Sequence, residues 1–199
     1  PRSTAQHAAV GQTQPASETV SEQWIGDNIV ATATEGMTNV IDLKKNVMFM
    51  VNHKDKTYLE TTLPLDMSKI MPAEMAGMAQ AMMKMTVSVT PNGQTKKVGT
   101  WTCAGYDVAM NMMMMPMKLQ VWATTDVPFD LESYMKNIYG NMIKAQLRLD
   151  DAAVKEMQKI KGFWILAETS AEMMGAKIRS VTEVVEIGKK TPPASAYAV

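Results

Sequence analysis

The side chains that could carry out acid–base or nucleophilic chemistry are few in this sequence. His53 lies in a polar stretch that predicts a turn, so we expect a solvated side chain rather than a catalytic base. Cys103, the single cysteine, lies in a predicted strand, where a small buried apolar residue is expected rather than a nucleophile paired with His53. Asp150 and Asp151 open a predicted helix, where carboxylates suit the helix dipole. With no nucleotide-binding, hydrolase or zinc motif, we predict a non-enzymatic protein without a cofactor.

Methionine is the residue type that stands out, at 21 of 199 residues. Thioethers are soft ligands that select Cu(I), and methionine is also flexible enough to line a cavity for apolar ligands. One group has the i, i+4, i+7, i+11, i+14 spacing of a single helical stripe: Met71, Met75, Met78, Met82 and Met85. A second group surrounds a predicted hairpin tip: Met110, Met112, Met113, Met114, Met115 and Met117.

Each methionine group can be explained without ligand or metal binding as well as with it. A methionine stripe at helical spacing is typical of core packing, so a lined cavity and a closed core both stay open for the first group. Methionines at a hairpin tip are harder to explain by packing, because such tips are normally polar. A Cu(I) site, an oxidation sink and a contact surface are the alternatives there.

The elements that must position these residues alternate between strand and helix patterns. Strands are expected over 22–25, 28–32, 38–42, 47–51, 57–61, 86–90, 97–102, 106–112, 117–124, 163–169 and 176–187. Helices are expected over 71–85, over 131–143 with Asp130 as the N-cap, and over 151–161. Short links between consecutive strands favour an antiparallel sheet, and the whole pattern predicts an α+β fold. We expect residues 1–20 to be a tail or a weak edge strand and 21–199 to be one domain.

Charge and hydropathy exclude several classes of protein. Lys and Arg together number 20, as do Asp and Glu, so a general nucleic-acid binder is not expected. No apolar run approaches the roughly 18 residues of a membrane span. Trp122 lies on the otherwise polar face of its predicted strand. The indole of Trp122 on this face allows two interpretations. The sheet is an ordinary one with a single amphipathic side chain, or a ligand, partner or second copy covers this face.

Four segments together resemble a family of bacterial envelope proteins called domain of unknown function 4412. They are residues 39–58, 95–106, 119–122 and 191–197, within a resemblance that covers about 20–199. That family is similar in fold to the LolA-type lipoprotein carriers. The resemblance implies a half-barrel of antiparallel strands with two or three helices on its concave face, and a periplasmic or otherwise exported protein. In LolA-type relatives the space between sheet and helices takes acyl chains, but the resemblance implies no established activity.

These observations lead to one main functional hypothesis and two alternatives. The main hypothesis is an envelope protein that binds a lipid or a lipoprotein acyl chain between sheet and helices. The residues expected to line that site are Met71, Met75, Met78, Met82, Tyr134, Ile138 and Met142. The alternatives are a methionine-rich Cu(I)-binding protein and an interaction module that binds an envelope protein partner without a small ligand.

Overall fold

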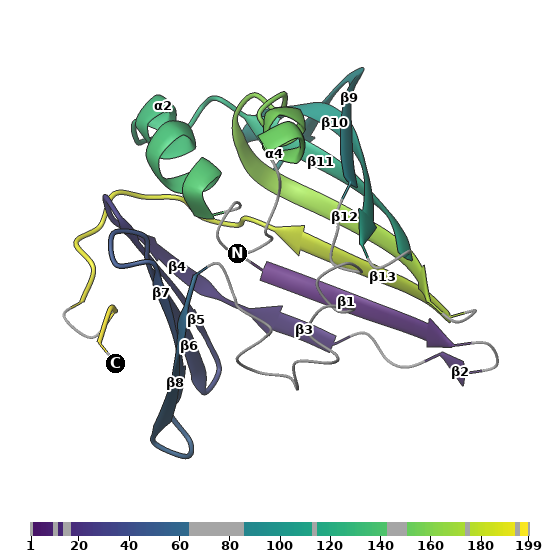
Figure 1. Ribbon diagram of the computed structural model, residues 1–199. Coiled ribbons are helices and arrows are strands. Elements are labelled where there is room, and N and C mark those ends of the chain that lie inside the picture. Colours follow the sequence, from purple (N-terminus) through teal and green to yellow (C-terminus); the bar gives the residue numbers. More distant parts are fainter. Residues whose placement is uncertain are drawn as a thin grey trace.

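The computed structural model describes residues 2–9, 12–13, 17–63, 86–112, 115–142, 151–173, 176–193 and 196–198. These residues fold mainly as strands, which form two antiparallel sheets (Figure 1). No helix among them is long and apolar enough to cross a membrane.

The larger sheet has eight strands and is built mainly from the C-terminal half of the chain. Its strands run, in spatial order, β2 (Gln12–Thr13), β1 (Arg2–Ala9), β13 (Ala176–Glu183), β12 (Phe163–Met173), β11 (Met115–Thr124), β10 (Trp101–Met112) and β9 (Thr86–Val98), and β3 (Ser17–Val20) also pairs with β1. The segment expected to be a tail or weak edge strand therefore contributes β1, which pairs with β13 from Arg2 to Ala8.

The smaller sheet is a five-stranded meander in which each strand pairs with its neighbour in sequence. Its strands are β4 (Glu22–Ile25), β5 (Ile29–Thr34), β6 (Met37–Asp42), β7 (Val47–Asn52) and β8 (Thr57–Thr62). The predicted strands over 22–61 are confirmed in this region. Short polar turns join them, as the pattern of β-branched runs broken by polar residues requires.

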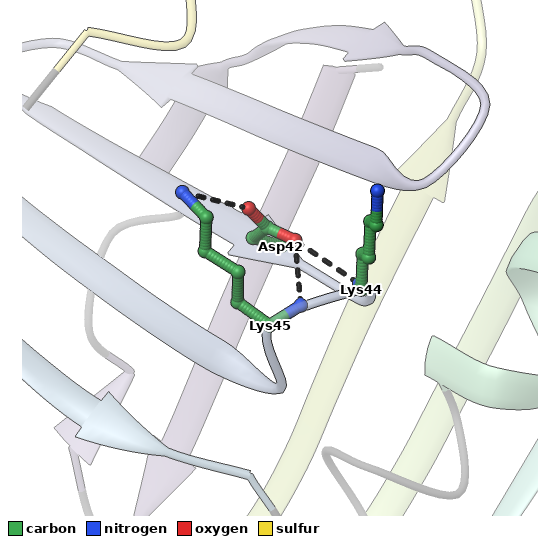
Figure 2. A network of polar contacts seen from close by, with 3 residues as sticks. All are labelled: Asp42, Lys44 and Lys45. Atoms are coloured by element: carbon green, nitrogen blue, oxygen red, sulfur yellow. Dashed lines mark hydrogen bonds and ion pairs between the residues drawn. The ribbon is translucent and has the colours of Figure 1, made fainter.

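The turn between β6 and β7 shows how a single side chain starts a hairpin. The Asp42 carboxylate accepts hydrogen bonds from the backbone N–H groups of Lys44 and Lys45, at 3.0 and 2.9 Å (Figure 2). The Lys45 ammonium lies 3.5 Å from the same carboxylate. Asn46 completes the turn at a φ of 54°, a left-handed conformation that asparagine tolerates. Burial disfavours the charged carboxylate, but the bonds from Lys45 and Lys44 outweigh it and hold the pKa of Asp42 below its usual range.

The helices pack on one side of the larger sheet (Figure 1). The first begins as α2 (Leu131–Ser133), continues as the π-helix η2 (Tyr134–Tyr139), and stays helical to Met142. The predicted N-cap is confirmed, because Ser133 N donates to the Asp130 carboxylate at 3.0 Å. The second helix, α4 (Asp151–Met157), is shorter than expected. Both helices share the main core with buried sheet residues, among them Val108 and Val121.

A second apolar cluster lies across the larger sheet from the helices. Trp122 is only 4 % exposed, because it packs with Cys103, Ile165 and Leu166 rather than facing solvent. Val184 and Ile187, from the chain that follows β13, cover this cluster. The apolar surface expected on this face is therefore covered by the chain itself.

The predicted fold class is wrong. The chain forms two antiparallel sheets and is mostly strand, so it is not an α+β half-barrel with two or three helices on the concave face of one curved sheet. Alternation of apolar and polar residues identifies strands, but it does not say which strands share a sheet. Here, among the described strands, β4–β8 pair only with one another and form a separate sheet. The predicted methionine helix over 71–85 lies outside the described residues.

The sequence also predicts a turn at Pro91, Asn92 and Gly93, between the strands expected over 86–90 and 97–102, because Asn and Gly tolerate a positive φ. This prediction is wrong. Pro91, Asn92 and Gly93 lie within β9, which runs without interruption from Thr86 to Val98. Residues 92–94 form a bulge opposite the single residue Gly105, between the pairs Thr95↔Ala104 and Pro91↔Tyr106. The turn propensity of Asn-Gly is therefore expressed as a β-bulge, with Gly93 at a φ of 71°.

Candidate functional site

A cleft of about 1150 Å³ lies where the two sheets and the first helix meet. One wall is the edge strand β4 with the turn that follows it. A second wall is the start of the helix together with Phe129 and Phe163. The third wall is the chain after β13, which crosses from the larger sheet towards the smaller one (Figure 1). Its volume is slightly above the range found for most small-molecule sites, about 300–1,000 Å³.

Three aromatic rings form the apolar wall of this cleft. Phe129, Tyr134 and Phe163 all line it, and their ring centroids are 5.4–5.6 Å apart in edge-on or tilted geometry. Behind them lie Tyr139 and Trp164, whose ring centroids are 6.0 Å apart. The wall is therefore one layer of a larger aromatic cluster, which fixes the orientation of each ring.

The π-helix explains how neighbouring turns contribute to this wall. The N–H of Gly140 donates to the carbonyl of Met135, five residues earlier, as a π-helix requires. This wider turn brings Tyr134 and Tyr139 close enough for their rings to contact at 6.1 Å. Ile138 is also buried and lines the cleft. Single π turns of this kind occur frequently at functional sites.

Burial keeps the phenols of this region neutral. It raises the pKa of Tyr134 to about 12, and it raises the pKa of Tyr139 as well. The Tyr139 hydroxyl and the indole nitrogen of Trp164 are buried and have no hydrogen-bond partner among the described residues. The layer behind the cleft wall is thus an apolar environment.

Charged side chains surround this apolar wall. Four carboxylates and two ammonium groups line the cleft: Glu22, Asp27, Asp130, Glu186, Lys189 and Lys190. Lys190 Nζ lies 2.9 Å from the Glu186 carboxylate, and this hydrogen bond raises the pKa of Lys190 and lowers the pKa of Glu186. The described lining residues include no His and no Cys.

Of the seven residues predicted to line the ligand site, the structure describes three, and two of these line the cleft. Tyr134 and Ile138 line the cleft. Met142 packs against the main core instead, and it is not among the cleft residues. The remaining four, Met71, Met75, Met78 and Met82, lie outside the described residues. That any of these residues binds a ligand stays a prediction.

Sequence reasoning missed most of the cleft. Trp24, Phe129 and Phe163 belong to three distant segments, and no spacing rule connects them. The aromatic residues beside the Asp130 cap, Phe129 and Tyr134, are the signal that could have marked one wall. The contribution of the chain after β13 has no local signal, because it depends on how the two sheets are placed.

The second methionine group lies at a hairpin, as predicted. Met110 and Met117 are cross-strand partners in β10 and β11, and so are Met112 and Met115. Met113 and Met114 lie outside the described residues. Met110 packs against the main core. Among the described residues, no three His, Cys, Asp or Glu side chains gather as a metal site would require.

The two candidate catalytic residues occupy ordinary structural positions. His53 is exposed in a turn, as expected, and its Nε2 lies 2.8 Å from the Thr38 hydroxyl. Cys103 is fully buried, which confirms the expected apolar role. Burial raises the pKa of its thiol, against a smaller opposing effect of Lys96.

Comparisons with known proteins identify no family for this chain. No family model matches the chain, and no curated protein is similar to it. Among solved structures, the chain is similar to one described as "Structure of PNGF-II in C2 space group", at 11% sequence identity and a TM-score of 0.39. The match covers 99% of this chain and 29% of that one, so this chain spans less than a third of that protein. A likeness at this TM-score carries no argument about fold or function.

Proposed function

We propose that this protein binds the apolar chain of an amphiphile, such as a lipid or lipoprotein acyl chain, in the cleft beside β4. The observation that carries this proposal is the aromatic wall of Phe129, Tyr134 and Phe163 along a cleft of about 1150 Å³. Apolar surface that a ligand removes from water contributes about 25 cal/mol per Å². The mechanism is therefore burial of an alkyl chain against preorganised rings, without a chemical step. Location in the cell envelope stays a prediction.

A neutral fluorescent probe tests this proposal. N-phenyl-1-naphthylamine becomes brighter when it enters an apolar site, so its titration measures an affinity. Phe129→Ala removes one ring from the wall and is expected to weaken binding at least fivefold, because several apolar contacts are lost. Phe49→Ala is the matched control, since Phe49 is also half-buried but lies on β7 of the smaller sheet, outside the described lining.

A second variant fills the cleft rather than widening it. Ile25 lines the cleft from β4 and is 36% exposed, so a larger side chain can be placed there without disturbing the core. Ile25→Trp is expected to reduce probe binding, whereas Leu59→Trp on the exposed strand β8 is expected to leave it unchanged. The proposal fails if the wild-type protein does not bind the probe, or if Phe129→Ala and Ile25→Trp both bind it normally.

Cu(I) binding at the β10–β11 hairpin is the second candidate function. The cross-strand pairs Met110↔Met117 and Met112↔Met115 favour it, because they bring four thioether-bearing residues to one hairpin end. A titration with Cu(I) under reducing conditions, followed by native mass spectrometry, gives the stoichiometry. Met117→Leu is expected to lower it, and an unchanged stoichiometry in a variant with every methionine from 110 to 117 replaced by leucine would exclude this site.

A further inference from the structure

We infer that the cleft prefers amphiphiles with a cationic headgroup over those with an anionic one. This inference rests on the proposed function, because it concerns which headgroup accompanies the apolar chain. The first observation is the charge of the lining, where carboxylates outnumber ammonium groups by two in a chain whose formal net charge is zero. The cleft is therefore more acidic than the molecule as a whole.

The carboxylates lie on all three walls rather than in one patch. Glu22 and Asp27 belong to β4 and its turn, Asp130 precedes the helix, and Glu186 follows β13. A headgroup at the mouth of the cleft therefore has negative charge on several sides. Asp130 remains charged there, because the bond from Ser133 N stabilises the carboxylate.

The positive charges in the lining are partly neutralised. The Lys190 ammonium is held by the Glu186 carboxylate at 2.9 Å, and Glu22 also attracts it. Lys189 is the other ammonium group of the described lining. Against it stand Glu22, Asp27 and Asp130, so the field that a bound headgroup meets is negative.

A ring of the aromatic wall that the alkyl chain leaves uncovered adds a second attraction for a cationic headgroup. The faces of phenylalanine and tyrosine rings attract cations, and quaternary ammonium groups are bound in this way by aromatic clusters. Phe129, Tyr134 and Phe163 supply such rings beside the charged rim. An anionic headgroup would gain nothing from these rings and would be repelled by the carboxylates.

Three amphiphiles with the same twelve-carbon chain test the inference: dodecyltrimethylammonium, dodecyl maltoside and dodecanoate. Their dissociation constants are measured by calorimetry below the micelle concentration and at low ionic strength, with displacement of the neutral probe to report the site. One unit charge about 7 Å away in water changes an affinity by about threefold. An excess of two charges is therefore expected to favour the cation by about tenfold over the neutral dodecyl maltoside and by roughly 50- to 100-fold over the anion. Salt at 0.5 M is expected to reduce both ratios.

Charge variants assign the effect to the cleft. Glu22→Gln and Asp27→Asn are each expected to weaken the cation about threefold and to strengthen dodecanoate by a similar factor. Glu35→Gln is the matched control, because Glu35 is an exposed carboxylate in the β5–β6 turn and does not line the cleft. The cation affinity of that variant is expected to equal the wild-type value.

The outcomes distinguish failure of the proposed function from failure of the headgroup preference. If none of the three amphiphiles displaces the probe, the proposed function and the headgroup preference both fail. If all three bind equally, or dodecanoate binds best, the preference is overturned while the apolar cleft stands. A cation preference that Glu35→Gln reduces as much as Glu22→Gln would also overturn it, since the effect would then come from net charge rather than from the cleft.

Discussion

Gly162, at the junction of α4 and β12, has a backbone conformation that other residues rarely adopt. Its φ is +122°, and a Cβ atom there would overlap the carbonyl of Thr124. Gly162→Ala is therefore expected to cost about 3 kcal/mol of unfolding free energy, measured by urea titration. Gly36→Ala is the control, since Gly36 also has a positive φ of +78°, but a Cβ atom there would meet no non-neighbouring heavy atom of the described residues within 4 Å. A cost of about 1 kcal/mol is expected for it. Equal costs would contradict a steric origin.

The buried tyrosines behind and within the cleft wall predict a loss of stability at high pH. Burial raises the pKa of Tyr134 to about 12 in the folded state, whereas an unfolded tyrosine ionises near 10. The folded chain therefore holds a proton that the unfolded chain releases, so stability is full below pH 10 and falls as pH rises from 10 to 12. Tyr134→Phe is expected to reduce that fall by up to about 1.4 kcal/mol per pH unit. Urea titrations between pH 9 and 12 measure it, and an unchanged slope would contradict the assignment.

Single residues were predictable where the cause is local. The Asp130 cap and the buried Cys103 follow from a few neighbouring residues, and both are confirmed. Tyr134 and Ile138 were placed on one helix face by their spacing, and both reach the cleft. Phe163 could not be assigned to the cleft in this way, because its partners there come from elements far away in the sequence.

At the scale of elements, strand positions were predictable but their continuity was not. The β-branched runs placed β4–β8 and the β12–β13 hairpin close to where they lie. The Asn92–Gly93 pair predicted a chain reversal, yet β9 continues through it, because the long β10 strand supplies pairing partners on both sides of the bulge. Long-range pairing therefore decides whether a turn signal becomes a turn or a bulge.

The bulge between β9 and β10 depends on a close approach that a double-mutant cycle can measure. A Cβ atom on Gly105 would lie 2.5 Å from Asn92 Oδ1 and 2.9 Å from the Trp122 ring. Gly105→Ala is therefore expected to cost about 2 kcal/mol. In an Asn92→Ala background the cost is expected to fall by about 1 kcal/mol, since one of the two obstacles is gone. Urea unfolding of the four proteins gives the coupling, and strict additivity would exclude this contact as the cause.

At the scale of the whole molecule, the division into two sheets was the feature that could not be predicted from the sequence. Each hairpin has the same kind of local pattern in both sheets, so alternation alone assigns all of them to one sheet. The cleft exists because β4, an edge of the smaller sheet, meets a helix that packs on the larger one. A site formed between layers requires knowledge of their arrangement, which explains why only part of its lining was foreseen.

The chain after β13 connects the two sheets, and this predicts what its removal would do. It covers the second cluster with Val184 and Ile187, lines the cleft, and places the Tyr197 hydroxyl close to Gly26 in the β4–β5 turn. A protein that ends at Gly188 keeps Val184 and Ile187 on the second cluster and loses the Tyr197 hydroxyl beside Gly26. Hydrogen exchange of β4 and β5 is therefore expected to accelerate at least fivefold, which corresponds to about 1 kcal/mol, while β10–β12 stay protected. Tyr197→Phe, which keeps the ring, is expected to show a smaller effect. Equal acceleration in both sheets would instead mean that the segment stabilises the molecule as a whole rather than the junction at β4.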